Sequence, residues 1–255
     1  MSTVAIIQAR SGSTRFPEKI LKPLAGHSVL WHVIQRAKRS MIPNLKVIVA
    51  TSTLKADDKV VREAEAAGAL VFRGSRSNVL MRYYECAGQF NANPIIRITG
   101  DCPFIDPRLI RKLWDRFYEE GFDYLCIDAM ESFPNGLDAE IFKKDLLDKM
   151  YERSKDRKGN WKLDREHVTT SIKHNNIIKR GRLIRTKPKY APQMRLTLDY
   201  PKDYAVLQSV ANALFPVNPF FGYRDIVVYM RKHPEICEVN ANLTDLRDDG
   251  KRDIY

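Results

Sequence analysis

The stretch IIQARSGSTRFPEK, residues 6–19, joins an apolar run to a loop of small and basic residues. The run Val4–Ile7 predicts a buried strand. In the loop, small residues let backbone N–H groups approach a ligand, and three cations can neutralise negative oxygens: Arg10, Arg15 and Lys19. Nucleotide-binding α/β domains often place their first strand and phosphate loop at the N-terminus. The stretch therefore predicts a polyphosphate-binding loop.

Two familiar phosphate-binding motifs are absent from this loop. The Walker A pattern Gly-x4-Gly-Lys-Ser/Thr does not occur, and Gly12 alone stands where the dinucleotide fingerprint needs three glycines. Taken by itself, a basic loop of Ser and Gly is more often a solvated surface turn. The choice between the two interpretations depends on the rest of the chain.

Length and composition are those of a soluble globular protein. The 255 residues suffice for one α/β domain with an elaboration, or for two small domains, and 44% are hydrophobic. No run approaches the ~18 apolar residues of a membrane span, and the N-terminus lacks the pattern of a secretion signal. We therefore expect a cytoplasmic protein without a membrane partner.

The cysteines and histidines form no metal-binding pattern. The four cysteines are scattered without a Cys-x-x-Cys pair, and no two of the five histidines are spaced i,i+4. A nucleophilic role for Cys102 would need a histidine that the nearby sequence does not supply. We expect buried thiols rather than disulfides or a zinc site.

The net charge of +12 is concentrated in one segment. From Lys143 to Arg195 there are 17 Lys and Arg against 6 Asp and Glu, an excess of 11. Such a segment can bind nucleic acid, an anionic substrate or an acidic partner. It has few aromatic residues for base stacking and no nucleic-acid motif, so we expect no nucleic-acid partner. A solvated or an anion-facing surface is favoured instead.

The first half of the chain alternates strand and helix patterns. Alternation of this kind predicts a mostly parallel sheet with helices on both faces, the Rossmann-like doubly wound α/β fold. The predicted strands are Val4–Ile7, Lys46–Ala50, Ala69–Phe72, Pro94–Ile98 and Tyr124–Ile127. The predicted helices are Val29–Lys38, Asp58–Ala67, Asn78–Gln89 and Pro107–Glu120. Asp106 and Gly121 are typical start and stop signals for the last of these helices.

The second half is less regular. The expected elements there are a returning strand and two helices, at Arg195–Leu198, Asp203–Leu214 and Tyr223–Lys232. We expect one domain over residues 1–255, whose core, 1–128 and 195–235, carries an insertion at approximately 129–194.

The loops that follow the first and fourth strands should meet. In the common strand order 3-2-1-4 these strands are neighbours, and ligands bind at their carboxyl ends. Asp101 then faces the basic loop across one crevice. A carboxylate opposite a polyphosphate suggests Mg²⁺ between them, and Asp199, after another apolar run, is the candidate second ligand. Alone, such an aspartate is as well explained as a turn residue or a helix cap.

Several motifs in order along the chain resemble one enzyme family. They are residues 6–19, VATS at 49–52, VFRGS at 71–75, RITGDCP at 97–103, REHVT at 165–169 and LDYPKD at 198–203. Together they resemble the cytidylyltransferases that make CMP-activated sugars, above all the spore-coat polysaccharide biosynthesis branch. More distant relatives activate 3-deoxy-manno-octulosonate and sialic-acid-type sugars. The resemblance covers most of the chain and implies a Rossmann-like sheet of the nucleotidyltransferase type.

The resemblance also implies roles for individual residues. Those expected to act on the triphosphate are Arg10, Arg15, Lys19 and Asp101. Mg²⁺ would be held by Asp101 and Asp199. Contacts to CTP would come from Ala9, Ser11, Gly12, Ser13, Thr51, Ser52, Arg73, Gly74 and Arg97. Positions where the family places acceptor or dimer contacts are Asp138, Glu140 and His167.

The implied reaction is Mg²⁺-dependent transfer of CMP from CTP to an anionic sugar, with release of pyrophosphate, for surface glycan biosynthesis. The anionic sugar would be a nonulosonic or 3-deoxy-octulosonic-type acid, and the enzyme a homodimer joined through the basic segment. Two alternatives stay open, a CDP product made from a sugar- or polyol-phosphate, and a non-catalytic nucleotide-binding protein. Glu18 departs from the family pattern, which more often has a glycine before the lysine.

Overall fold

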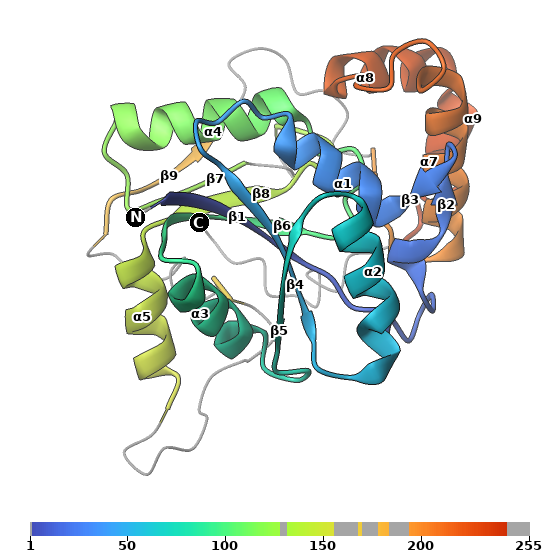
Figure 1. Ribbon diagram of the computed structural model, residues 1–255. Helices are drawn as coiled ribbons and strands as arrows, with labels where there is room; N and C mark the ends of the chain where they lie inside the picture. The colour runs from blue at the N-terminus through green and yellow to red at the C-terminus, as the bar shows by residue number, and fades with distance from the viewer. Residues whose placement is uncertain (1, 128–131, 156–167, 170–177, 184–193, 244–255) are drawn as a thin grey trace.

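A computed structural model describes the chain except for residues 1, 128–131, 156–167, 170–177, 184–193 and 244–255. At its centre lies a seven-stranded sheet (Figure 1). From edge to edge, the strands are β5 (Leu70–Gly74), β4 (Lys46–Ser52), β1 (Ser2–Gln8), β6 (Ala92–Thr99), β8 (Ala139–Phe142), β7 (Tyr124–Ile127) and β9 (Arg180–Leu183). The first four are parallel, in the predicted order, so the doubly wound sheet is confirmed.

Strand β8 runs against its neighbours. It pairs antiparallel with both β6 and β7, while β7 pairs parallel with β9. Strands β8 and β9, together with helix α5 (Lys144–Arg153), come from the segment 129–194 that was expected as an insertion. The described parts of this segment therefore add two strands to the central sheet and one helix to a layer that covers it. The division of the chain into a core and an insertion stays a prediction.

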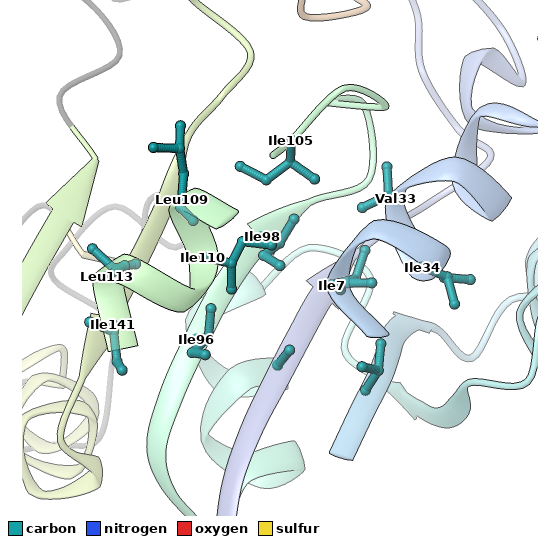
Figure 2. Close-up of a cluster of buried hydrophobic side chains, with 14 of the residues drawn as sticks. Ile7, Val33, Ile34, Ile96, Ile98, Ile105, Leu109, Ile110, Leu113 and Ile141 are labelled. Atoms are coloured by element: carbon teal, nitrogen blue, oxygen red, sulfur yellow. The ribbon is translucent and has the colours of Figure 1, made fainter. Parts of the chain in front are cut away.

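Helices cover both faces of the sheet, and the middle residues of its central strands are accordingly apolar and buried. Helices α1 (Val29–Lys38), α2 (Asp58–Ala66) and α4 (Pro107–Glu119) pack on one face. Figure 2 draws part of this layer, in which side chains of α1 and α4 lie against those of the strands. Helices α3 (Val79–Gln89) and α5 pack on the other. Ile6 and Ile7, which point to opposite faces, are both fully buried, and each contributes about 1.5–3 kcal/mol to folding.

The predicted boundary signals act as expected at α4. Asp106 Oδ1 accepts a hydrogen bond from Arg108 N at 2.8 Å, and Gly121 follows the helix with a φ of 64°. Asp106 Oδ2 also accepts from Tyr223 N at 2.9 Å, which ties α4 to helix α8 (Tyr223–Lys232). No helix in the described part of the chain is both long and apolar enough to cross a membrane.

A third group of helices packs beside the end of the sheet (Figure 1). Helices α7 (Pro201–Leu214), α8 and α9 (Pro234–Glu238) enclose an apolar cluster with the hairpin β2 (Pro23–Leu24) and β3 (His27–Ser28). Arg36 of α1 joins this group to the sheet layer, because its Nη1 donates to Phe221 O at 2.8 Å and its guanidinium lies 4.5 Å from the Phe221 ring. The segment just before α7 contacts the loop after β1 separately, through Asp199 and Arg15.

The prediction of a returning strand at Arg195–Leu198 is wrong. One isolated bridge pairs Arg195 with Asn135, and Leu198 N donates to Asp101 O at 2.9 Å. Leu196 and Leu198 are buried in the cluster of the C-terminal helices. The alternating apolar residues therefore pack on helices instead of pairing in the sheet.

Candidate active site

A cavity of about 470 Å³ opens at the carboxyl ends of β1 and β6. Its walls come from the loop after β1, the start of α3, the loop after β6, and the residue two before α7. The crevice predicted from topology is therefore where the cavity lies. Predicted site residues that line it are Ala9, Arg10, Gly12, Ser13, Arg15, Lys19, Asp101 and Asp199.

The ammonium of Lys19 bridges the two predicted metal ligands. Its Nζ lies 2.7 Å from Asp101 Oδ2 and 2.9 Å from Asp199 Oδ1. Burial would lower the pKa of Lys19, but the two carboxylates outweigh burial and raise that pKa above its ordinary value. Burial would likewise raise the pKa of Asp101, but Lys19 holds it below its ordinary value. Lys19 and Asp101 are therefore both charged at neutral pH.

Asp199 is oriented by residues that sequence reasoning did not single out. Arg195 Nη2 lies 2.8 Å from Asp199 Oδ2, and Arg195 Nε lies 2.9 Å from Oδ1 of the fully buried Asp203. Asp203 Oδ2 accepts from the backbone N–H groups of Asp199 and Tyr200 and so caps α7. The Asp199 side chain therefore does not serve as the cap and is free to face the cavity, where Arg15 Nη2 lies 3.1 Å from its Oδ1.

The loop after β1 is anchored by Asp57, which was also missed. Asp57 Oδ1 accepts from both Ser11 N and Ser11 Oγ at 2.7 Å, and Ser52 Oγ donates to Asp57 Oδ2. Burial would raise the pKa of Asp57, but these hydrogen bonds lower it. Ser11 and Ser52, both predicted CTP contacts, thus hold the loop in place through one carboxylate.

The other predicted CTP contacts on β4 and β5 lie outside the lining of the cavity. Arg73 donates to Ser52 O and Leu54 O at 3.1 and 2.8 Å, and its Nη1 lies 2.7 Å from Asp58 Oδ1. Thr51 pairs with Arg73 in the sheet and is buried, and its hydroxyl has no partner among the residues that the structure describes. Gly74 ends β5, where a Cβ would clash with the Phe72 ring at 2.7 Å. Their roles in binding CTP stay predictions.

Arg97 and Glu140 form a buried ion pair on adjacent strands. Arg97 Nη1 lies 3.0 Å from Glu140 Oε2, and Arg97 Nε donates to Gln8 Oε1 at 3.3 Å. Burial opposes the charge of Arg97, but Glu140 raises its pKa. Of the other predicted acceptor residues, Asp138 accepts from Gly136 N at 3.1 Å, and His167 lies outside the described residues.

The cavity also contains two arginines that were not predicted. Arg76, in the loop before α3, and Arg82, in its first turn, line it together with Arg10, whose Nη1 donates to Arg76 O at 3.0 Å. The sequence carries one signal for Arg82. It stands three residues after Val79 and four before Cys86 on the buried stripe of α3, where a charged residue is unusual.

Cys102 matches its prediction as a buried thiol. The residue is 2% exposed, and burial raises the pKa of its thiol well above the ordinary value. A thiol of this kind is a poor nucleophile.

The residues present suit a magnesium ion. Asp101 and Asp199 both already direct a carboxylate oxygen at one cation, Lys19 Nζ. Carboxylate oxygens are the protein ligands that Mg²⁺ takes, usually one or two of them beside waters and phosphates. Within the described residues no group of three or more His, Cys, Asp or Glu gathers. Phosphate oxygens or waters would therefore complete the shell.

A largely parallel sheet, a basic loop after its first strand and two carboxylates across the switch point define an α/β nucleotidyltransferase. Comparison with known families agrees with this class. The family model described as "Cytidylyltransferase" matches residues 4–249. The chain belongs to the cytidylyltransferase family and is thus a nucleotidyltransferase enzyme.

Three relatives indicate which proteins the chain is similar to. The spore coat polysaccharide biosynthesis protein SpsF of Bacillus subtilis is 32% identical over 234 residues, 90% of this chain and 94% of SpsF. A solved cytidylyltransferase from Leptospira borgpetersenii superposes with a TM-score of 0.83 at 31% identity, covering 96% of this chain and 99% of its own. A 3-deoxy-manno-octulosonate cytidylyltransferase of Geobacter sulfurreducens is 36% identical over 112 residues, 43% of each chain. The predicted family and fold are confirmed.

Proposed function

We propose that this protein transfers CMP from CTP to an anionic sugar, with Mg²⁺ as cofactor and pyrophosphate as the second product. The observation that carries the proposal is the convergence of Asp101 and Asp199 on one cation, in a cavity shared with the basic loop. The similarity to a 3-deoxy-manno-octulosonate cytidylyltransferase supports a sugar acid as acceptor.

In the proposed reaction, an acceptor oxygen attacks the α-phosphorus of CTP in line. The bond from the α-phosphorus to the bridging oxygen breaks, and that oxygen leaves with pyrophosphate. Little covalent chemistry falls to the protein, so positioning and charge stabilisation account for most of the catalysis. When bound, Mg²⁺ would neutralise phosphate charge at Asp101 and Asp199.

The residues of the cavity have distinct tasks in this reaction. Arg195 and Asp203 hold the Asp199 carboxylate toward the cavity, and Asp57 keeps the loop after β1 in one conformation. Arg15 and Lys19 supply cations beside the carboxylates. The Asp199 carboxylate and the loop after β1 are thus in place before substrate arrives, which lowers the reorganisation needed in the transition state.

The acceptor-binding residues, the homodimer and the cytoplasmic location stay predictions. The carboxylate of Glu140 is already engaged by protein groups, because it is paired with Arg97 and accepts hydrogen bonds from Tyr124 and Thr169 at 3.0 and 3.1 Å. An acceptor role for Glu140 therefore has little support.

A substrate panel with mass spectrometry tests the proposal. The full chain is incubated with CTP and Mg²⁺ against sugar acids and against sugar- and polyol-phosphates. We expect a product with one phosphate from a sugar acid and pyrophosphate in equal amount. A product with two phosphates would instead establish the CDP-forming alternative. Nucleotide binding without any product across the panel would favour the non-catalytic alternative.

A further inference from the structure

The cavity has a surplus of positive charge on one side. Among the described residues, five cationic side chains and two carboxylates line it. Both carboxylates are already paired, Asp101 with Lys19, and Asp199 with Lys19, Arg15 and Arg195. The remaining cations, Arg10, Arg76 and Arg82, therefore form a wall whose charge the carboxylates of the cavity do not neutralise.

Arg82 is the most informative member of this wall. The residue is 1% exposed, its Nη1 donates to Ser75 O at 2.7 Å, and its buried Nε has no partner. Within the described part of the chain, no carboxylate forms an ion pair with it. Burying a charge without a counter-ion destabilises a protein by several kcal/mol, so such a residue calls for an explanation beyond packing. The carboxylate of Asp57 acts on Arg82 without forming an ion pair with it, and an anionic ligand in the cavity would provide a directly paired counter-ion.

The surroundings of Arg82 also favour the binding of an anion beside it. Burial, together with the neighbouring charge of Arg10, lowers the pKa of Arg82 to about 10, and the opposing effects of Tyr83 and Asp57 do not offset this. The positive end of α3 lies at the same wall, since its first residue, Val79, lines the cavity. The guanidinium fork of arginine matches the oxygens of a phosphate in pairs.

We propose that Arg82 and Arg76 join Arg10 in a subsite for the terminal phosphates of the donor nucleotide, the part that leaves as pyrophosphate. This inference rests on the proposed function for the identity of the nucleotide. The reacting α-phosphate belongs at Asp101 and Asp199, so the terminal phosphates lie elsewhere in the cavity. The wall of unpaired arginines, next to the small residues Gly12 and Ser13, is the surface that suits them. Phosphate binding is thus shared between the N-terminal loop and α3.

Calorimetric titration of the full chain with three probes tests the subsite: inorganic pyrophosphate, CTP and cytidine. In Arg82→Met, we expect the affinities for pyrophosphate and CTP to fall about tenfold or more, with the affinity for cytidine unchanged. Arg76 is exposed, so Arg76→Gln should lower the same two affinities by a smaller factor. Arg116→Gln, on α4 and paired with Glu120, is the matched control and should bind all three probes as wild type does.

Thermal unfolding separates a binding role from a structural one. Methionine replaces a buried unpaired charge with an apolar side chain of similar length, so ligand-free Arg82→Met should melt no lower than wild type. The rise in Tm that pyrophosphate gives to wild type should be lost. If Arg82→Met does not fold, Arg82→Lys keeps the charge without the fork and should still bind pyrophosphate more weakly than wild type.

Two outcomes would overturn the subsite: unchanged pyrophosphate affinity in the Arg82 variants, or equal losses for CTP and cytidine. Failure of the proposed function looks different. Wild type would then turn over no CTP, while pyrophosphate binding would still depend on Arg82.

Discussion

Lys19 and Asp101 lie 82 residues apart in the sequence and form an ion pair of 2.7 Å between Nζ and Oδ2. The pair joins the loop after β1 to the end of β6 across the cavity. Because Lys19 Nζ also lies 2.9 Å from Asp199 Oδ1, one ammonium stands where the two carboxylates meet. A metal ion bound by both carboxylates has to replace that ammonium, which the phosphates of a nucleotide can draw away. Metal binding and nucleotide binding are therefore expected to be coupled.

The substitution Lys19→Met should uncouple metal binding from nucleotide binding. Without the ammonium, Asp101 and Asp199 face each other with less compensating charge, so we expect Mn²⁺ to bind without nucleotide about tenfold or more tightly than it binds wild type. Electron paramagnetic resonance of free Mn²⁺ measures this affinity directly. Lys22→Met is the control, because Lys22 lies 4.6 Å from the Phe16 ring and pairs with neither carboxylate. Equal Mn²⁺ affinities of Lys19→Met and wild type would argue against the Lys19 ammonium occupying the position of the metal ion.

His32 should make stability fall in mild acid. The residue is 2% exposed, burial lowers its pKa from 6.5 to about 4, and Nε2 donates to Leu24 O at 2.6 Å. Between these pH values the unfolded chain takes up a proton that the folded chain does not, so the free energy of unfolding decreases as pH falls. Above pH 6.5 this contribution to the pH dependence vanishes.

Urea unfolding at pH 7.5 and pH 4.5 measures the effect. Wild type should lose about 2–3 kcal/mol more over this interval than His32→Gln, whose amide can still donate to Leu24 O. His233→Gln, at an exposed histidine, should behave as wild type does. The same pH dependence in wild type and His32→Gln would show that another group is responsible.

Gly136 should be needed to place Asp199. Its φ is 97°, and a Cβ there would lie 2.5 Å from Thr197 N and against the Leu196 backbone. We expect Gly136→Ala to lower the free energy of unfolding by about 2–4 kcal/mol and to reduce CTP turnover, because the segment before Asp199 has to move. Gly121→Ala is the matched control. Its φ is 64° with open space around the Cβ, so it should lose about 1 kcal/mol and keep its turnover.

The regular half of the fold was predictable because its periodicity is strong. Helices α1 and α8 have the predicted bounds, and the order of the first four strands follows from their alternation with helices. The same topology correctly brought Asp101 opposite the basic loop. Arg195–Leu198 misled the prediction, because an alternating apolar run reads as a strand whether a sheet or a group of helices buries it.

The pairing of charges in the cavity could not be predicted from the sequence. Three cations in one loop appeared equivalent, yet Lys19 and Arg15 contact carboxylates while Arg10 donates to a backbone carbonyl. Which cations remain unpaired depends on the tertiary placement of Asp199. The contribution of Arg82 was hidden for the same reason, since a single charged residue in an apolar helix stripe does not indicate which cavity it faces.

Pyrophosphate release from CTP in the presence of Mg²⁺ and a sugar acid tests the central claim most directly. Wild type should release pyrophosphate with CTP in preference to UTP, ATP and GTP, and Asp101→Asn should lose about a hundredfold or more of the rate while remaining folded. Asp115→Asn, on α4 and paired with Arg111, should keep the rate of wild type. Full activity in a folded Asp101→Asn would contradict the account.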